Sequence, residues 1–185
     1  MQMTALDLSN FAGLGAMMLV TLNVLLGVLV SRNYNPARRW PHRKIPLFRI
    51  HNWTAYLALV LILVHPALLL FNATPVFRVS DLLYPVHSPG QSLYNSLGAL
   101  TWYALLVVVV TSYFRPRLGS RPWKKIHYTA YVAASAMFVH GTLIDPNLKG
   151  QPPDLIDGEK VLIEGCFLLV AAASVWRVRQ KKKLL

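Results

Sequence analysis

The chain is poor in cysteine and in charged residues, and acidic residues are especially scarce. Of 185 residues, one is a cysteine (Cys166) and seven are acidic, and charged residues of both signs make up 14%. A single cysteine excludes an intramolecular disulfide, and we interpret Cys166 as a small buried residue. Hydrophobic residues account for 55% of the chain, and its mean hydropathy is +0.42. This composition is typical of a membrane protein and argues against a soluble globular domain.

The chain also lacks two sequence signatures. It has no Gly-rich dinucleotide-binding fingerprint, so we expect no flavin or nicotinamide domain and no unaided oxidation of NADPH. We expect residues 1–185 to form a single domain. Its N-terminus carries Asp7, and no basic residue, before the first apolar run, which is not the pattern of a secretory signal peptide.

Long apolar stretches, by contrast, are abundant. Five are long enough to cross a bilayer as helices. They cover about Phe11–Val30, Ile50–Phe71, Leu93–Phe114, Ile126–Ile144 and Val161–Trp176. The last stretch is the shortest and contains Glu164. We therefore predict an all-α, polytopic membrane bundle of about five transmembrane helices.

The net charge of +12 is distributed very unevenly along the chain. All but three of the nineteen Lys and Arg residues fall in the first connection, the third connection or the tail. These residues are Arg32, Arg38, Arg39, Arg43, Lys44, Arg49, Arg115, Arg117, Arg121, Lys124, Lys125, Arg177, Arg179, Lys181, Lys182 and Lys183. The positive-inside rule makes their face cytoplasmic, with the N-terminus outside and the C-terminus inside. This asymmetry accounts for the charge without a nucleic-acid partner.

Four histidines are placed as two pairs inside two of the apolar stretches. His51 and His65 are fourteen positions apart, and His127 and His140 are thirteen apart. At about 1.5 Å of rise per residue, each interval covers about 20 Å, most of the hydrocarbon thickness of a bilayer. Both stretches leave the cytoplasmic face, so equal depth pairs His51 with His127 near the inside and His65 with His140 near the outside. Two bis-histidine sites stacked in an apolar bundle suit two b-type haems that carry electrons across the membrane.

Other interpretations of these histidines stay open. A membrane histidine can also be an interfacial residue or a helix contact, and the same four side chains would serve a haem-free scaffold or a metal transporter. Ionisable groups inside membrane helices nonetheless tend to mark function. The weakest geometric link is the thirteen-residue interval, which misses the same helix face by about 140°. Tilt, a local change of winding near Gly141 or rotated haem planes would absorb this mismatch.

Further candidates flank the histidines. Haem propionates favour cations, and we expect Arg49, Arg121, Lys124 and Lys125 to serve the inner haem and Arg78 the outer one. Aromatic residues are placed to pack on the porphyrin faces, although interfacial belts use the same residues; they are Trp53, Tyr56, Trp123, Tyr128 and Tyr131. We interpret His42 and His87 as surface residues. No C-x-x-C-H motif is present, so the haems would be held non-covalently.

These residues resemble the ferric reductase-like transmembrane domain that NADPH oxidases, ferric reductases and short bacterial relatives share. RIHNWTAYLALVLILVHPALL resembles the first haem helix of the family, and LGSRPWKKIHYTAYVAASAMFVHG the second. SDLLYPV at Ser80–Val86 and YALLVVVVTSYFRPRLG at Tyr103–Gly119 resemble short bacterial members. The resemblance covers residues 13–178 and implies that His51 and His127 ligate the inner haem and His65 and His140 the outer one. The first helix of the family has no counterpart here.

We therefore predict a dihaem cytochrome b of a bacterial inner membrane, an electron-transfer subunit of an oxidoreductase system. Its expected donor is a cytoplasmic flavoprotein or a quinol, and its acceptor lies outside the cytoplasm. The basic face would dock an acidic partner. The alternative is a terminal enzyme that reduces ferric chelates or oxygen at the outer haem and is fed by a separate flavoprotein.

Overall fold

Helices make up the regular structure of the chain. The computed structural model describes residues 3–35 and 45–182, with the side chains of residues 180–182 excepted. The helices are α1 (Ala5–Ser31), α2 (Leu47–Leu68), η1 (Leu69–Phe71), α3 (Val79–Leu83), η2 (Pro85–His87), α4 (Ser92–Tyr113), α5 (Arg115–Leu118), α6 (Ser120–Leu143) and α7 (Gly158–Lys182). No strand occurs in the described ranges, so the all-α prediction is confirmed there. Arg38, Arg39, His42, Arg43, Lys44 and Lys183 lie outside the described residues.

The five predicted apolar stretches fall in the five long helices. Four helices are long and apolar enough to cross a membrane: α1, α2 continued by η1, α4, and α7 up to Arg179. The helix α6, which contains the stretch Ile126–Ile144, is not among these four, because His127, His140 and the other polar residues within that stretch lower its mean hydropathy. The span predicted for α6 therefore remains a prediction, whereas the shortest stretch, Val161–Trp176, lies in a helix that qualifies.

The ends of the helices follow from local chemistry. Thr4 caps α1 and forms a capping box with Asp7: the Thr4 hydroxyl accepts from the Asp7 N–H at 3.1 Å, and the Asp7 carboxylate accepts from the Thr4 N–H at 2.9 Å. Pro66 lies two residues before the end of α2, which then tightens into η1. Gly119, at φ +78°, makes the sharp turn between α5 and α6.

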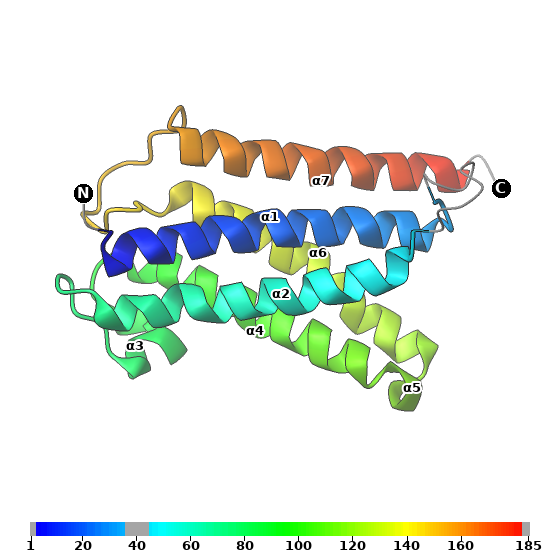
Figure 1. Cartoon of the computed structure of the whole chain (residues 1–185), viewed down its shortest axis with the longest axis horizontal. Coiled ribbons are helices and arrows are strands. Elements are labelled where there is room, and N and C mark those ends of the chain that lie inside the picture. Colours follow the sequence, from blue (N-terminus) through cyan, green and yellow to red (C-terminus); the bar gives the residue numbers. More distant parts are fainter. Residues whose placement is uncertain (1–2, 36–44, 183–185) are drawn as a thin grey trace.

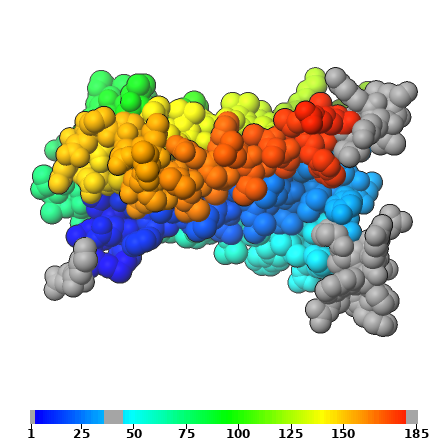
Figure 2. All heavy atoms as spheres, turned by 90° about the horizontal axis from the view of Figure 1, so that it is seen from above, coloured from blue at the N-terminus to red at the C-terminus, as the bar shows by residue number. Residues whose placement is uncertain are grey.

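The helix α1 lies at the centre of the bundle, with α2 and α4 on one side and α7 on the other (Figure 1). Small side chains such as Ala16, Ala58 and Ala134 are buried where the helices meet, so their backbones approach closely. Figure 2 shows α7 lying along α1 over the length of the bundle. Many large apolar side chains point outward and are exposed, as expected for helices that face lipid.

Charge divides the two ends of the bundle. At one end α1, α4 and α7 finish and α2 and α6 begin; we call it the basic end. The described basic side chains there are Arg32, Arg49, Arg115, Arg117, Arg121, Lys124, Lys125, Arg177 and Arg179. The opposite end, which we call the acidic end, holds α3 and all seven acidic residues of the chain (Asp7, Asp81, Asp145, Asp154, Asp157, Glu159 and Glu164) (Figure 1).

Candidate functional site

Two pairs of histidines lie between α2 and α6, and each pair has one ring from α2 and one from α6. The ring centres of His51 and His127 are 6.2 Å apart near the basic end, with the ring planes at 70°. The ring centres of His65 and His140 are 6.4 Å apart near the acidic end, with the planes at 76°. We call these the basic-end pair and the acidic-end pair. They are the pairs that equal depth predicts, whereas their role as ligands remains a prediction.

The separation within each pair suits one metal atom between two imidazoles. With metal–nitrogen bonds of about 2 Å on opposite sides of a metal, two imidazole ring centres lie about 6 Å apart. Both pairs meet this distance. Within the described residues, no group of three or more His, Cys, Asp or Glu side chains converges on one point. Each pair therefore offers two ligands, which suits a group that brings the remaining ligands itself, as a porphyrin does.

Hydrogen bonds fix the protonated nitrogen in three of the four rings. The Nδ1 atom of His65 lies 2.7 Å from the Ser9 carbonyl oxygen. The Nδ1 of His51 lies 3.0 Å from the carbonyl of Asn23, and that of His140 lies 2.8 Å from the carbonyl of Tyr94. Because a carbonyl only accepts, Nδ1 must carry the proton in each ring, which leaves Nε2 with a free lone pair.

The supporting residues on α1 also bind the histidine backbones. The Ser9 hydroxyl donates to the His65 carbonyl at 2.8 Å, and the Asn23 amide donates to the His51 carbonyl. The Asn23 amide also donates to the Thr54 hydroxyl at 2.9 Å. Each histidine of α2 is thus held at its ring and at its backbone, so α1 positions the α2 histidine of each pair.

Three glycines make room for the rings. A Cβ atom at Gly13 would lie 3.0 Å from the His65 ring, at Gly27 3.2 Å from the His51 ring, and at Gly98 2.9 Å from the His140 ring. A side chain at any of these positions would push the ring from its place. Each glycine follows by four positions the residue whose carbonyl accepts from that ring. Gly13 and Gly27 are also fourteen positions apart, like His51 and His65, and this signal was present in the sequence.

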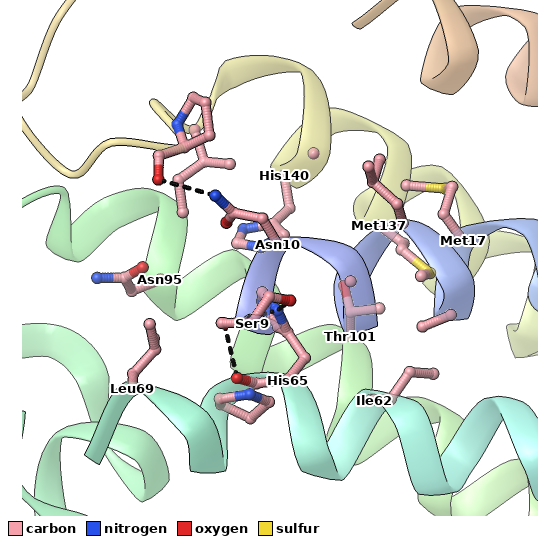
Figure 3. A pocket seen from close by; sticks show the side chains of 18 of the residues that line it. Ser9, Asn10, Met17, Ile62, His65, Leu69, Asn95, Thr101, Met137 and His140 are labelled. Carbon is pink, nitrogen blue, oxygen red and sulfur yellow. Dashed lines mark hydrogen bonds between the residues drawn. The ribbon is translucent and has the colours of Figure 1, made fainter. Parts of the chain in front are cut away.

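A largely apolar cavity lies beside the acidic-end pair. His65, from α2, and His140, from α6, line it together with residues of α1, α4 and α7 (Figure 3). Met17, Ile62 and Met137 supply apolar surface, and Asn10, Asn95 and Thr101 supply polar groups. The Asn10 amide donates to the Pro146 carbonyl at 3.2 Å. A cavity between the helices of a bundle, with histidines from two facing helices, is a usual place for a cofactor.

Lys160, on α7, is a buried cation that lies outside the clusters of basic residues at the basic end. It is 3% exposed and lines the same cavity. Its ammonium donates to the carbonyls of Gly141 at 2.7 Å and Ile144 at 2.6 Å, at the end of α6. Among the described Lys and Arg residues, Lys160 is the one that lines this cavity.

The predicted propionate cations lie farther out. Arg49, Arg121, Lys124 and Lys125 are exposed at the basic end. Arg78 is exposed before α3, where its backbone N–H donates to Asp81 at 2.8 Å, and the lining of the cavity does not include it. Within the described residues, no hydrogen bond or cation–π contact joins these five side chains to the paired histidines.

The aromatic candidates divide into three sets. Trp123 stacks on His127, with ring centres 4.9 Å apart, and the guanidinium of Arg115 lies 4.3 Å from the centre of a Trp123 ring. Tyr128 and Tyr131 bind Arg177 through their hydroxyls, at 3.2 and 2.8 Å. Trp53 and Tyr56 point outward, at 59% and 39% exposed. His87 is exposed in η2, as predicted.

The loop after α6 closes the acidic end. The carboxylate of Asp145, 4% exposed, accepts backbone N–H bonds from Asn147, Lys149 and Gln151 at 2.9, 2.9 and 3.1 Å. Burial raises the pKa of Asp145, but these bonds and the Lys149 charge outweigh it, so the pKa lies below its ordinary value. The Gln91 side chain joins the Asp145 backbone to the start of α4.

Comparison with known proteins places this arrangement in a family. A family model described as "Ferric reductase like transmembrane component" matches residues 12–138. The match includes His51, His65 and His127 and ends just before His140. No curated protein matches the chain significantly, and no solved structure does.

Proposed function

The chain belongs to the ferric reductase-like transmembrane family, and we propose on that basis that it moves electrons across a membrane through two b-type haems. It is an integral membrane protein, with four helices apolar enough to span a bilayer. The observation that carries the proposal is the stacking of two opposed imidazole pairs along one bundle. A haem bound at such a pair takes up and gives up single electrons.

In this proposal the four histidines would bind haem iron at two depths in the membrane, one pair at each depth. His51 and His127 would hold a haem at the basic end, and His65 and His140 would hold one at the acidic end. In three of the rings a backbone carbonyl holds the proton on Nδ1, so Nε2 would be the nitrogen that binds iron. Along α2 the two levels are about 20 Å apart, which is most of the thickness of the hydrocarbon core.

Cations near each level would balance the haem propionates. At the acidic end Lys160 is added to the predicted Arg78, since it lines the cavity beside His65 and His140. At the basic end we retain Arg49, Arg121 and Lys124 as propionate partners, because long basic side chains reach several ångströms from their backbones. In the rest of the bundle, the apolar side chains of the core exclude water.

The charges at the two ends of the bundle suggest where the electron donor and the acceptor bind. We propose that the basic end faces the cytoplasm, where Lys and Arg residues accumulate. The donor there would be a flavoprotein with an acidic surface, or a quinol, and the acceptor would meet the acidic end. The membrane would be a bacterial inner membrane.

Haem content tests the proposal directly. We expect the purified protein to contain two non-covalent haems b per chain with a sharp reduced α-band. His65→Ala should remove the acidic-end haem and spare the other, and His51→Ala should do the reverse. His87→Ala, which changes an exposed histidine outside the pairs, is the matched control and should retain both haems. Solvent extraction that returned no haem, or one per chain, would overturn the proposal.

A further inference from the structure

The partners of the paired histidines repeat at a regular interval on α1 and α4. In three cases the ring donates to the carbonyl of one residue and packs against a glycine four positions later. On α1 this unit occurs twice, fourteen positions apart, as Ser9 with Gly13 and Asn23 with Gly27. On α4 it occurs once, as Tyr94 with Gly98. The same interval along α4 leads to Val108 and Ser112.

Ser112 is the exception to this pattern, because it has a side chain where the other three units have glycine. The His127 ring makes its Nδ1 contact with the Ser112 hydroxyl oxygen, at 3.3 Å, and not with a carbonyl. The same hydroxyl donates to the Val108 carbonyl at 2.6 Å. It also accepts from the Trp123 indole N–H at 3.2 Å. The hydroxyl therefore lies between the ring and the carbonyl that the pattern would assign to it.

The donors and acceptors at Ser112 can be counted completely. A serine hydroxyl has one proton and two lone pairs. Its proton goes to Val108, so both other contacts must donate to it, and His127 must be protonated on Nδ1. The hydroxyl thus selects the same ring tautomer that the carbonyls select elsewhere, and Nε2 of His127 stays free to bind iron.

The thirteen-residue interval on α6 explains why a hydroxyl group stands between the His127 ring and the Val108 carbonyl. The helices α4 and α6 are neighbours that run in opposite directions, and His140 is matched with Tyr94. Fourteen positions along α4 lead to Val108, whereas fourteen positions back along α6 lead to Ile126, one residue before the histidine. His127 is therefore out of register with the Val108 carbonyl by one residue, and the Ser112 side chain spans the difference.

We propose that Ser112 is the positioning residue for His127 and that it makes the haem at the basic end electronically different from the one at the acidic end. The inference rests on the proposed haem ligation. A hydroxyl that already accepts from Trp123, at 3.3 Å from the ring, withdraws less of the Nδ1 proton than a carbonyl at 2.7 to 3.0 Å. His127 is then the least basic of the four ligands, which raises the reduction potential of its haem.

Redox titration of the full chain tests this assignment. A separate titration of His140→Ala, which should lack the acidic-end haem, identifies which of the two potentials belongs to the basic-end haem. Ser112→Ala removes the acceptor of His127, so the potential of that haem should rise while the acidic-end haem keeps its value. Ser112→Thr keeps the hydroxyl and should restore the original potential. Ser96→Ala is the matched control, since the Ser96 hydroxyl donates to the Ser92 carbonyl one turn back on the same helix.

The variant Trp123→Phe gives an independent measurement, which remains possible if Ser112→Ala does not fold. It keeps an aromatic ring beside His127 but removes one donor from the hydroxyl, so the potential should fall. Two haems with unchanged potentials in Ser112→Ala, or in Trp123→Phe, would overturn the inference and leave the proposed function intact. A wild-type protein without haem, or a His127→Ala variant that keeps both haems, would instead overturn the proposed function.

Discussion

Each paired histidine has two ring nitrogens, and a residue on a neighbouring helix decides which one carries the proton. Ser9 and Asn23 on α1 do this for α2, and Tyr94 on α4 does it for His140. All three use the main-chain carbonyl, and at Ser9 the hydroxyl oxygen also lies 3.1 Å from Nδ1 of His65. The glycine four positions later is what the ring requires, because it leaves the space that the ring occupies.

Gly98→Ala should therefore disturb the acidic-end pair. The added Cβ would lie 2.9 Å from the His140 ring, so the ring must shift, at a cost of about 1–3 kcal/mol for overpacking. The expected result is loss or a changed spectrum of the acidic-end haem, measured by haem content and low-temperature absorption, while the basic-end haem is retained. Gly165→Ala on α7, where a Cβ would meet nothing within 4 Å, is the control. A Gly98→Ala protein with two unaltered haem spectra would contradict the role of this glycine.

At the scale of helices, apolar runs were enough to predict where the long elements lie. The predicted Leu93–Phe114 differs by one residue at each end from α4, Ser92–Tyr113. Equal depth was enough to pair the histidines. What could not be predicted is which main-chain carbonyls accept from the rings, because that depends on how α1 and α4 slide against α2 and α6. Lys160 was missed for the same reason, since its burial is a consequence of α7 packing on the end of α6.

Lys160→Met should loosen the contact between α6 and α7. Methionine keeps the apolar stem but leaves the carbonyls of Gly141 and Ile144 without their donor, at a cost of about 1–3 kcal/mol. We expect a lower midpoint of thermal unfolding in detergent and, because a cation is lost beside the cavity, a lower potential of the acidic-end haem. Lys149→Met, which changes an exposed lysine in the nearby loop, should leave both values unchanged. If Lys160→Met had the same midpoint of thermal unfolding as the wild-type protein, these two bonds would not hold the helices together.

For the whole molecule, the separation of charge has the clearest consequence. Basic side chains gather where α1, α4 and α7 finish, and all seven acidic residues lie at the opposite end. The helix α1 begins at the acidic end, and α7 finishes at the basic end (Figure 1). Five long helices that alternate in direction produce this arrangement if α6 crosses the membrane with the others, as the pairing of its histidines with those of α2 requires.

Impermeant thiol labelling in intact cells tests this topology. Short loops rich in Lys and Arg are retained in the cytoplasm, so a cysteine at the basic end should be protected and one at the acidic end labelled. Ser120→Cys and Gln151→Cys suit the two ends because both residues are exposed. Cys166 is buried and is replaced by alanine to remove background. Labelling of Ser120→Cys with protection of Gln151→Cys would reverse the topology, so the basic-end haem would face the outside and electrons from a cytoplasmic donor would enter at His65 and His140.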